Sequence, residues 1–129
     1  MPITFTIPGN PVPQPRPRFT TRGKFGKAYT PSRHPVNAYR RAIAAAAVEA
    51  GAGVHEQPVQ CVIDAVFARP KSHARMKTPP ALPVADCDNI AKAVQDALNG
   101  VAWKDDRQVG RLVVEKSYGP EGRTTVRIS

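Results

Sequence analysis

Apolar and polar residues alternate in four short stretches of the chain, which is the pattern of strands that bury one face. The first is 3–7 (ITFTI), and the clearest is 58–68 (PVQCVIDAVFA), where Asp64 is expected to face solvent. The last two stretches, 107–117 and 123–128, flank a turn-forming segment that contains Gly-Pro. We therefore predict that these last two strands form a hairpin.

Helical spacing of apolar residues marks two further stretches. Residues 36–50 contain a run of alanines, which favours a helix. The buried stripe of this helix is expected to comprise Tyr39, Ile43, Ala46 and Ala47. Residues 89–99 end before Gly100, and their apolar face consists of Ile90, Ala93, Val94, Ala97 and Leu98.

The resulting order, β–α–β–α–β–β, predicts an α+β fold with two helices packed on a mixed sheet. A length of 129 residues fits a single domain covering residues 1–129. No run of about 18 apolar residues exists, so we expect no membrane segment. The N-terminus lacks the charged and long apolar regions of a secretory signal, so Cys61 and Cys87 are predicted to be free thiols in the cytoplasm.

Two long stretches, 8–35 and 69–85, show neither the alternation of a strand nor the apolar spacing of a helix. Both are rich in proline and carry many Lys and Arg residues. The chain as a whole has a net charge of +9, which favours a polyanionic partner such as nucleic acid. The same composition also occurs in ordinary long loops, which are expected to be mobile. The candidate nucleic-acid contacts are Arg16, Arg18, Arg22, Lys24, Lys27 and Arg33 in the first loop, and Arg69, Lys71, Arg75 and Lys77 in the second.

Half of the ten acidic residues lie in one segment, DCDNIAKAVQDALNGVAWKDDRQV (residues 86–109). Asp86 and Asp88 are two residues apart at the end of an extended stretch, so their side chains are expected to project to the same side. Asp88 is also a good N-cap for the helix that follows. Capping accounts for one of these two aspartates and leaves Asp86 unexplained.

Lys92 lies one helical turn after Asp88, off the apolar face of the helix. Because helical side chains lean toward the N-terminus, the Lys92 ammonium is expected to reach back over Asp86 and Asp88. Asp96 follows one turn later, and its simplest interpretation is a surface ion pair with Lys92.

Asp105 and Asp106 lie in a predicted turn, where adjacent aspartates are usually solvated. The return of the chain from helix to strand could bring one of them beside Asp86 and Asp88. Three converging carboxylates repel each other unless they bind a cation, and carboxylate oxygens select Mg²⁺, with Mn²⁺ as a substitute. Zinc is not expected, because no Cys and His residues have its ligand spacing. A metal held beside a basic surface indicates phosphodiester hydrolysis.

The pattern D-x-D-N-x-x-K, followed by D-A-L-N-G and W-x-D-D, resembles the RusA family of Holliday junction resolvases in its phage-encoded branch. The segments PGNPVPQPRPRF and AYTP are similar to the same branch, so the resemblance covers most of the chain. It implies a small dimeric, Mg²⁺-dependent endonuclease that cuts four-way DNA junctions in recombination and repair within a bacterial cell. The implied metal-binding and catalytic residues are Asp86, Asp88 and Asp106, with Asp105 as the alternative in its pair, and the catalytic lysine Lys92.

A four-way junction has approximate two-fold symmetry and needs two matching nicks, which a symmetric homodimer with two equivalent sites provides. Two other functions fit the residues. One is a metal-dependent nuclease acting on another branched DNA, and the other is a non-catalytic nucleic-acid-binding module. A binding module would be expected to lack the acidic residues, because without a metal they weaken the binding of DNA.

Overall fold

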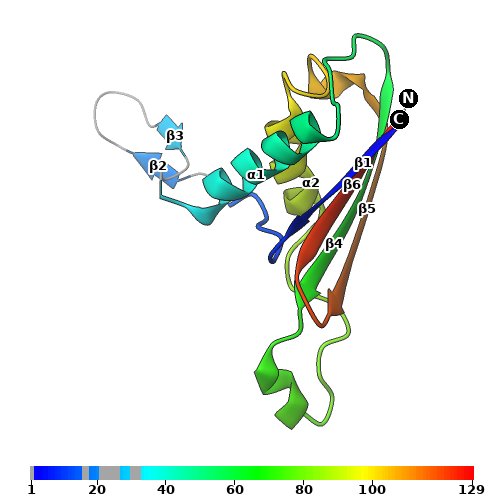
Figure 1. Cartoon of the computed structure of the whole chain (residues 1–129). Coiled ribbons are helices and arrows are strands. Elements are labelled where there is room, and N and C mark those ends of the chain that lie inside the picture. Colours follow the sequence, from blue (N-terminus) through cyan, green and yellow to red (C-terminus); the bar gives the residue numbers. More distant parts are fainter. Residues whose placement is uncertain (1, 16–17, 21–26, 30–32) are drawn as a thin grey trace.

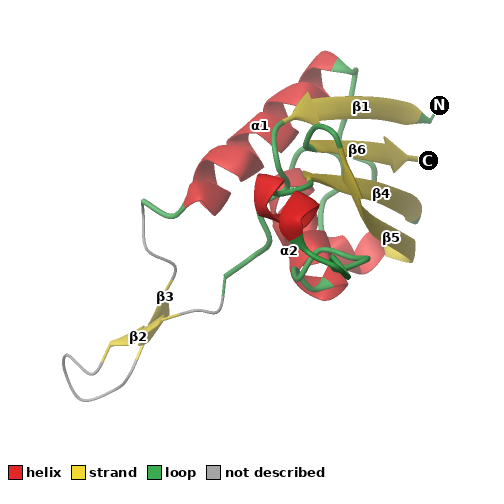
Figure 2. Ribbon diagram, turned by 90° about the horizontal axis from the view of Figure 1, so that it is seen from below, coloured by secondary structure: helices red, strands yellow, loops and turns green. Residues whose placement is uncertain are grey.

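The computed structural model describes residues 2–15, 18–20, 27–29 and 33–129, and of 18–20 and 27–29 it describes the backbone alone. Four strands, β1 (Ile3–Pro8), β4 (Val59–Ala68), β5 (Val109–Gly119) and β6 (Arg123–Ile128), form one sheet in the order β1-β6-β4-β5. Strands β4 and β5 run parallel and the other pairs antiparallel, so the sheet is mixed. Helices α1 (Pro35–Glu49) and α2 (Cys87–Leu98) cover one face, which confirms the predicted α+β fold (Figures 1 and 2).

The predicted hairpin of the last two strands is wrong. Strand β4 lies between β5 and β6, pairing in parallel with the first and antiparallel with the second. The short connection after β5 therefore crosses the end of β4, so closely that a Cβ on Gly119 would lie 2.7 Å from the Val66 Cγ1. Turn residues between two strands predict a reversal of direction, but they do not determine which strand becomes the neighbour.

The two proline-rich loops contain short elements that the hydrophobic pattern does not reveal. Strands β2 (Arg18–Thr20) and β3 (Lys27–Tyr29) pair as a small separate hairpin that projects from the body of the molecule (Figure 1). The second loop contains a 3₁₀ helix, η1 (Lys71–Arg75). Another 3₁₀ helix, η2 (Asp106–Gln108), immediately precedes β5.

The core lies between the two helices and the inner face of the sheet. Helix α2 buries all five predicted residues together with Ala91. Helix α1 buries three of its predicted residues, whereas Ala46 is half-buried and Val36 is fully buried in addition. The Tyr39 hydroxyl at the inner face forms a 2.6 Å hydrogen bond with the buried Thr124 hydroxyl, which satisfies both polar groups.

The outer face of the sheet is more polar. Asp64 lies on this face, half-exposed, and its Oδ2 is 3.5 Å from the Arg123 guanidinium, which confirms its predicted orientation. Within the described part of the chain, no helix combines the length and apolar character needed to cross a membrane.

Trp103 is the largest fully buried side chain, with an exposed fraction of 0%, and its Nε1 donates to Asn99 Oδ1 at 2.7 Å. We expect Trp103→Ala to lower the free energy of unfolding by about 3–5 kcal/mol, because it leaves a large cavity in the core and removes the hydrogen bond to Asn99. Urea denaturation followed by far-UV circular dichroism measures this loss. A loss below about 1 kcal/mol would show that the core does not depend on the indole ring.

Candidate active site

Asp86 and Asp88 lie at the N-terminus of α2, in a local structure that differs from the predicted one. Asp86 is the N-cap, with extended backbone, and its carboxylate makes no capping hydrogen bond. Asp88 lies within the first helical turn, where its Oδ1 accepts the Asn89 backbone N–H at 3.0 Å. The prediction of Asp88 as N-cap is therefore wrong, because both positions hold a capping residue type and the helix begins at the earlier one.

The start of α2 is held against the far end of β5. Lys116 of β5 donates from its Nζ to the Ala85 carbonyl oxygen at 2.8 Å. Ala85 directly precedes Asp86, so this hydrogen bond places both exposed aspartates beside the last third of β5. The N-terminal end of the helix dipole also favours their negative charge.

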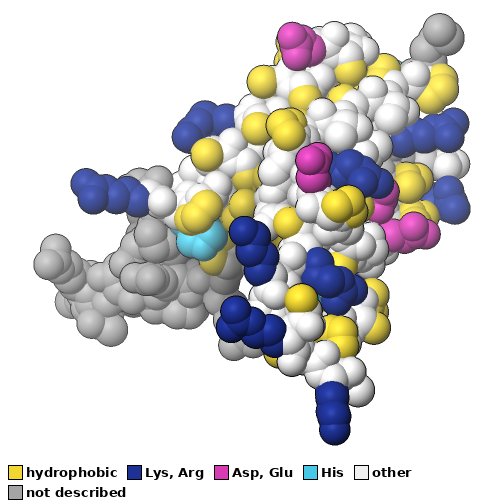
Figure 3. Space-filling view, turned by 60° about the horizontal axis from the view of Figure 1, so that its bottom comes forward, with side chains coloured by type: hydrophobic (Ala, Val, Ile, Leu, Met, Phe, Trp, Pro, Cys, Tyr) yellow, Lys and Arg dark blue, Asp and Glu magenta, His cyan; other side chains and the backbone are white. Residues whose placement is uncertain are grey.

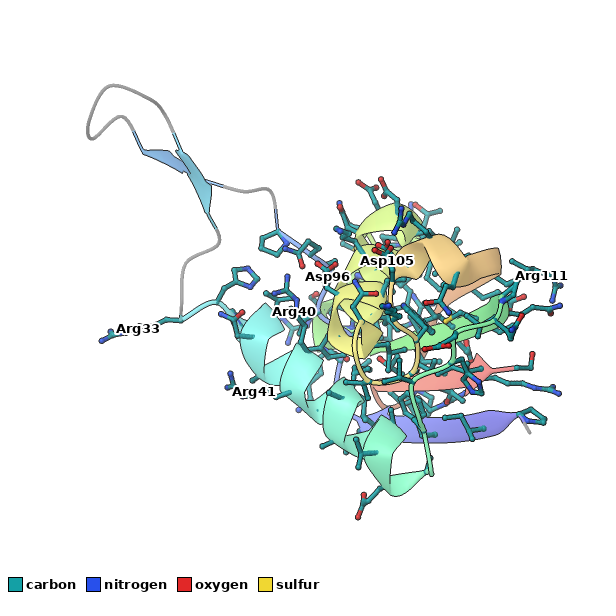
Figure 4. All side chains as sticks on the ribbon, turned by 90° about the horizontal axis from the view of Figure 1, so that it is seen from above. Arg33, Arg40, Arg41, Asp96, Asp105 and Arg111 are labelled. Atoms are coloured by element: carbon teal, nitrogen blue, oxygen red, sulfur yellow. The ribbon has the colours of Figure 1, made fainter. Side chains whose placement is uncertain are left out.

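Lys92 points away from these aspartates. Its Nζ lies 3.0 Å from Asp96 Oδ1, one turn further along α2, which confirms the predicted surface ion pair and not the predicted reach over Asp86 and Asp88. Asp96 Oδ2 is also 3.7 Å from the Arg40 guanidinium of α1, and Figure 4 shows Arg40 pointing toward it. Asp96 therefore links the two helices, and Lys92 reaches it because the two residues lie one helical turn apart.

Asp105 has a structural role in η2. Its Oδ1 accepts the Arg107 backbone N–H at 2.9 Å, and its own N–H donates to Gln108 Oε1 at 3.0 Å, forming a capping box. The pKa of Asp105 lies below its usual value, first because of the Arg107 backbone hydrogen bond, and further because of the Asp106 side chain and the Arg107 guanidinium. Asp105 is thus committed to capping, which leaves Asp106 as the better candidate ligand.

The structure does not bring Asp106 beside Asp86 and Asp88 within one chain. Gln108 Nε2 donates to the His55 carbonyl at 2.7 Å, which holds η2 where β4 begins, whereas Asp86 lies near Lys116. The steps along β5 from Val109 to Lys116 span about 23 Å at roughly 3.3 Å per residue. Accordingly, no three His, Cys, Asp or Glu side chains among the described residues are placed to hold a metal ion.

The six aspartates nevertheless fall into two sets. Asp64, Asp96 and Asp105 each form an ion pair with Lys or Arg. Within the described ranges, no such pair is formed by the three aspartates of the predicted site, which are Asp86, Asp88 and Asp106. The glutamates likewise form no ion pair with any described Lys or Arg residue, so the division into two sets applies to the aspartates only. In a chain with a net charge of +9, the predicted ligands are the aspartates left available to a cation.

The second basic loop forms an arm, residues 69–85, beyond the end of the sheet (Figure 1). Arg69 makes intramolecular contacts at the base of this arm. Its guanidinium lies 4.5 Å from the ring centroid of Tyr118 in β5, and its Nη1 donates to the Pro80 carbonyl at 3.2 Å. The His73 ring meets the same tyrosine edge-on at 5.3 Å. Lys and Arg side chains gather where this part of the molecule comes forward in Figure 3. The remaining predicted contacts of the arm, Lys71, Arg75 and Lys77, are exposed.

The predicted contacts in the first basic loop are mostly untested by the structure. Arg16, Arg22 and Lys24 lie outside the described residues. Arg18 begins β2 and Lys27 begins β3, and their backbone alone is described. Arg33 is exposed ahead of α1 and is visible at the edge of the molecule in Figure 4.

The two cysteines differ in accessibility, and this gives a simple test of the local structure. Cys61 is fully buried in β4, and burial raises the pKa of its thiol to about 12, whereas Cys87 is half-exposed between the two aspartates. We expect a thiol reagent to label Cys87 in the native protein and Cys61 only after unfolding. Mass spectrometry of peptides labelled with and without denaturant measures this, and rapid native labelling of Cys61 would contradict the fold.

Comparison with known proteins places this chain in a family of nucleases. Residues 8–129 match the family model described as Endodeoxyribonuclease RusA. The chain is also similar to an uncharacterised protein, YqaN of Bacillus subtilis strain 168, with 31% identity over 138 residues, which cover 98% of this chain and 94% of that protein. The match includes the two basic loops, both helices and every acidic residue of the candidate site, and it shows that this chain belongs to the RusA family of endodeoxyribonucleases.

Proposed function

We propose that this protein is a Mg²⁺-dependent endonuclease that resolves four-way DNA junctions by paired symmetric nicks. The observation that carries the proposal is the complete D-x-D-N-x-x-K and D-D motif of a RusA family member. Its supporting feature is that the three motif aspartates have no Lys or Arg partner among the described residues, in a strongly basic chain. A junction-binding protein without catalysis would have no use for three uncompensated carboxylates.

In this proposal the metal would be held by Asp86 and Asp88 of one protomer and by Asp106 of the partner subunit in a homodimer, because the three do not meet within one chain and carboxylate oxygens are the ligands that Mg²⁺ prefers. When bound there, Mg²⁺, or Mn²⁺ in its place, would supply charge neutralisation at the scissile phosphate and a more acidic water for attack. Lys92 binds the phosphate as charge develops on it. To do so it must leave Asp96, which costs little because their ion pair is partly exposed and weak.

DNA binding is assigned to the basic residues around this centre. Lys71, Arg75 and Lys77 of the arm are exposed and form no ion pair with any described residue, so they are available to phosphates. The first basic loop contributes further contacts from its Lys and Arg residues, among them Arg33. The protein acts as a homodimer, which presents two equivalent sites to a two-fold symmetric junction. We place it in the bacterial cytoplasm, in DNA recombination and repair, with a phage or prophage origin.

A panel of DNA substrates tests this function. A four-way junction, a flap, a fork and a linear duplex of matching sequence are incubated with the protein in Mg²⁺, and in EDTA as the control. We expect cleavage of the junction alone, and only with Mg²⁺. Cleavage of flaps or forks at the same rate would instead indicate a general branched-DNA nuclease. Tight junction binding without cleavage in Mg²⁺ or Mn²⁺ would indicate a binding module.

A further inference from the structure

The arm, residues 69–85, exposes apolar side chains as well as cations. Three of the six large hydrophobic side chains that are exposed among the described residues lie in it, namely Met76, Leu82 and Val84. The arm contains no Asp or Glu, so every charge it carries is positive. Figure 3 shows hydrophobic side chains interspersed among the Lys and Arg side chains where this part of the molecule comes forward. Such a surface fits a partner that combines negative charge with apolar faces, as DNA does with its phosphates and stacked bases.

Both ends of the arm are fastened to the last third of β5. At its beginning, the Arg69 guanidinium and the buried His73 ring both lie against Tyr118. The Met76 N–H donates to the His73 carbonyl at 3.1 Å, which fixes Met76 directly after η1. At the other end, Lys116 holds the Ala85 carbonyl. An arm fixed at both ends can press its side chains into a partner instead of bending away from it.

The arm leads directly into the candidate active site. Val84 is the most exposed of its apolar side chains, with an exposed fraction of 89%, and it lies two residues before Asp86. The four prolines of the arm restrict its backbone, so little conformational entropy is lost when a partner binds. Under the proposed function, the DNA that reaches Asp86 and Asp88 also meets Val84.

We propose that the apolar side chains of the arm form a wedge that enters the branch point of a four-way junction and unstacks the bases there. The cations of the arm hold the surrounding phosphates. The inference rests on the proposed function, because it takes the junction as the substrate. Base stacking is already interrupted at a branch point, whereas a continuous duplex must be opened at a cost before an apolar side chain can enter. The wedge therefore makes the protein select junctions over duplexes.

A base analogue that fluoresces when unstacked reports on the wedge directly. A four-way junction carries 2-aminopurine at its branch point, and EDTA prevents cleavage. The arm variant combines Met76→Ala, Leu82→Ala and Val84→Ala, which are exposed changes that should leave the fold intact. At saturating protein, we expect the wild type to raise the fluorescence and the arm variant to leave it near that of the free junction.

The affinities for junction and duplex give a second readout. We expect the arm variant to bind the junction about tenfold more weakly than the wild type, because burial of a single such side chain contributes that much. Its affinity for a linear duplex should stay unchanged, since the wedge does not enter a continuous stack. Replacing Lys71, Arg75 and Lys77 with Gln should instead weaken the binding of both DNAs, because phosphates are common to them.

The matched control combines Val48→Ala and Val54→Ala, which truncate exposed apolar side chains outside the arm. This control should behave like the wild type in both measurements. An equal rise in fluorescence with the arm variant and the wild type would overturn the wedge, while junction cleavage by the wild type would leave the proposed function intact. A wild type that neither binds nor cleaves junctions would contradict both. An arm variant that keeps its junction affinity but loses binding to anionic lipid vesicles would assign the arm to a membrane surface and overturn the wedge.

Discussion

Asp88→Asn is expected to abolish junction cleavage while leaving junction binding intact. The substitution removes a negative metal ligand and keeps the shape of the side chain and its hydrogen bond from the Asn89 N–H. Changes to groups that only orient metal ligands cost about 10–100-fold, so loss of a ligand should cost more than about a hundredfold in the nicking rate. Loss of a negative charge cannot weaken attraction to DNA phosphates. Nicking rates at saturating protein, and junction affinity measured in EDTA, test both parts.

Asp64→Asn is the matched control for this experiment. Asp64 is half-exposed and lies on the outer face of the sheet, where it pairs with Arg123, whereas Asp88 is exposed at the start of α2. Its replacement should leave both cleavage and binding close to wild type. Cleavage by Asp88→Asn at more than a tenth of the wild-type rate would remove Asp88 from the metal site.

The second large effect is a contrast between two adjacent residues. Asp106→Asn is expected to abolish cleavage, whereas Asp105→Asn should retain most of it. Asparagine caps helices as well as aspartate does, so η2 should survive the change at Asp105, which loses only an exposed ion pair with Arg107. The Asp106 carboxylate forms no ion pair among the described residues, so it is the one that we expect to bind the metal.

Single-turnover nicking of the junction by the two variants measures this contrast, with circular dichroism as a check that both are folded. An equal loss of nicking activity in both variants would mean that cleavage depends on the Asp105 and Asp106 carboxylates together. The opposite order, with Asp105→Asn inactive and Asp106→Asn active, would assign the third ligand to Asp105 and make the capping box incidental.

The sequence pattern predicts the main elements of this fold well, because their periodicity depends on local burial. Both helices and all four long strands lie where apolar spacing places them. The neighbour relation of β5 and β6 could not be predicted in the same way. It depends on the crossover that inserts β4 between them, which is a property of the whole sheet.

For the candidate site, too, the sequence predicts which residues are involved but not how they are arranged in space. The residue types at Asp86, Asp88 and Asp106 predict a metal site, and the endodeoxyribonuclease family to which the chain belongs is consistent with that prediction. Their placement depends on the direction of α2, which carries the chain from the end of β5 back to its beginning. A helix of this length between two acidic pairs predicts separation within one chain, and this geometric signal was available in the spacing of the motif.

The measurement that tests the central claim most directly maps the cuts in a synthetic four-way junction labelled on each strand in turn, with Mg²⁺ or EDTA present. A linear duplex of matching sequence serves as the control. We predict two nicks at symmetric positions on opposing strands, in the junction only and with Mg²⁺ only. Tight junction binding that produces no nicks with Mg²⁺ or Mn²⁺ would contradict the account, because the exposed aspartates would then serve neither the metal nor the cleavage assigned to them.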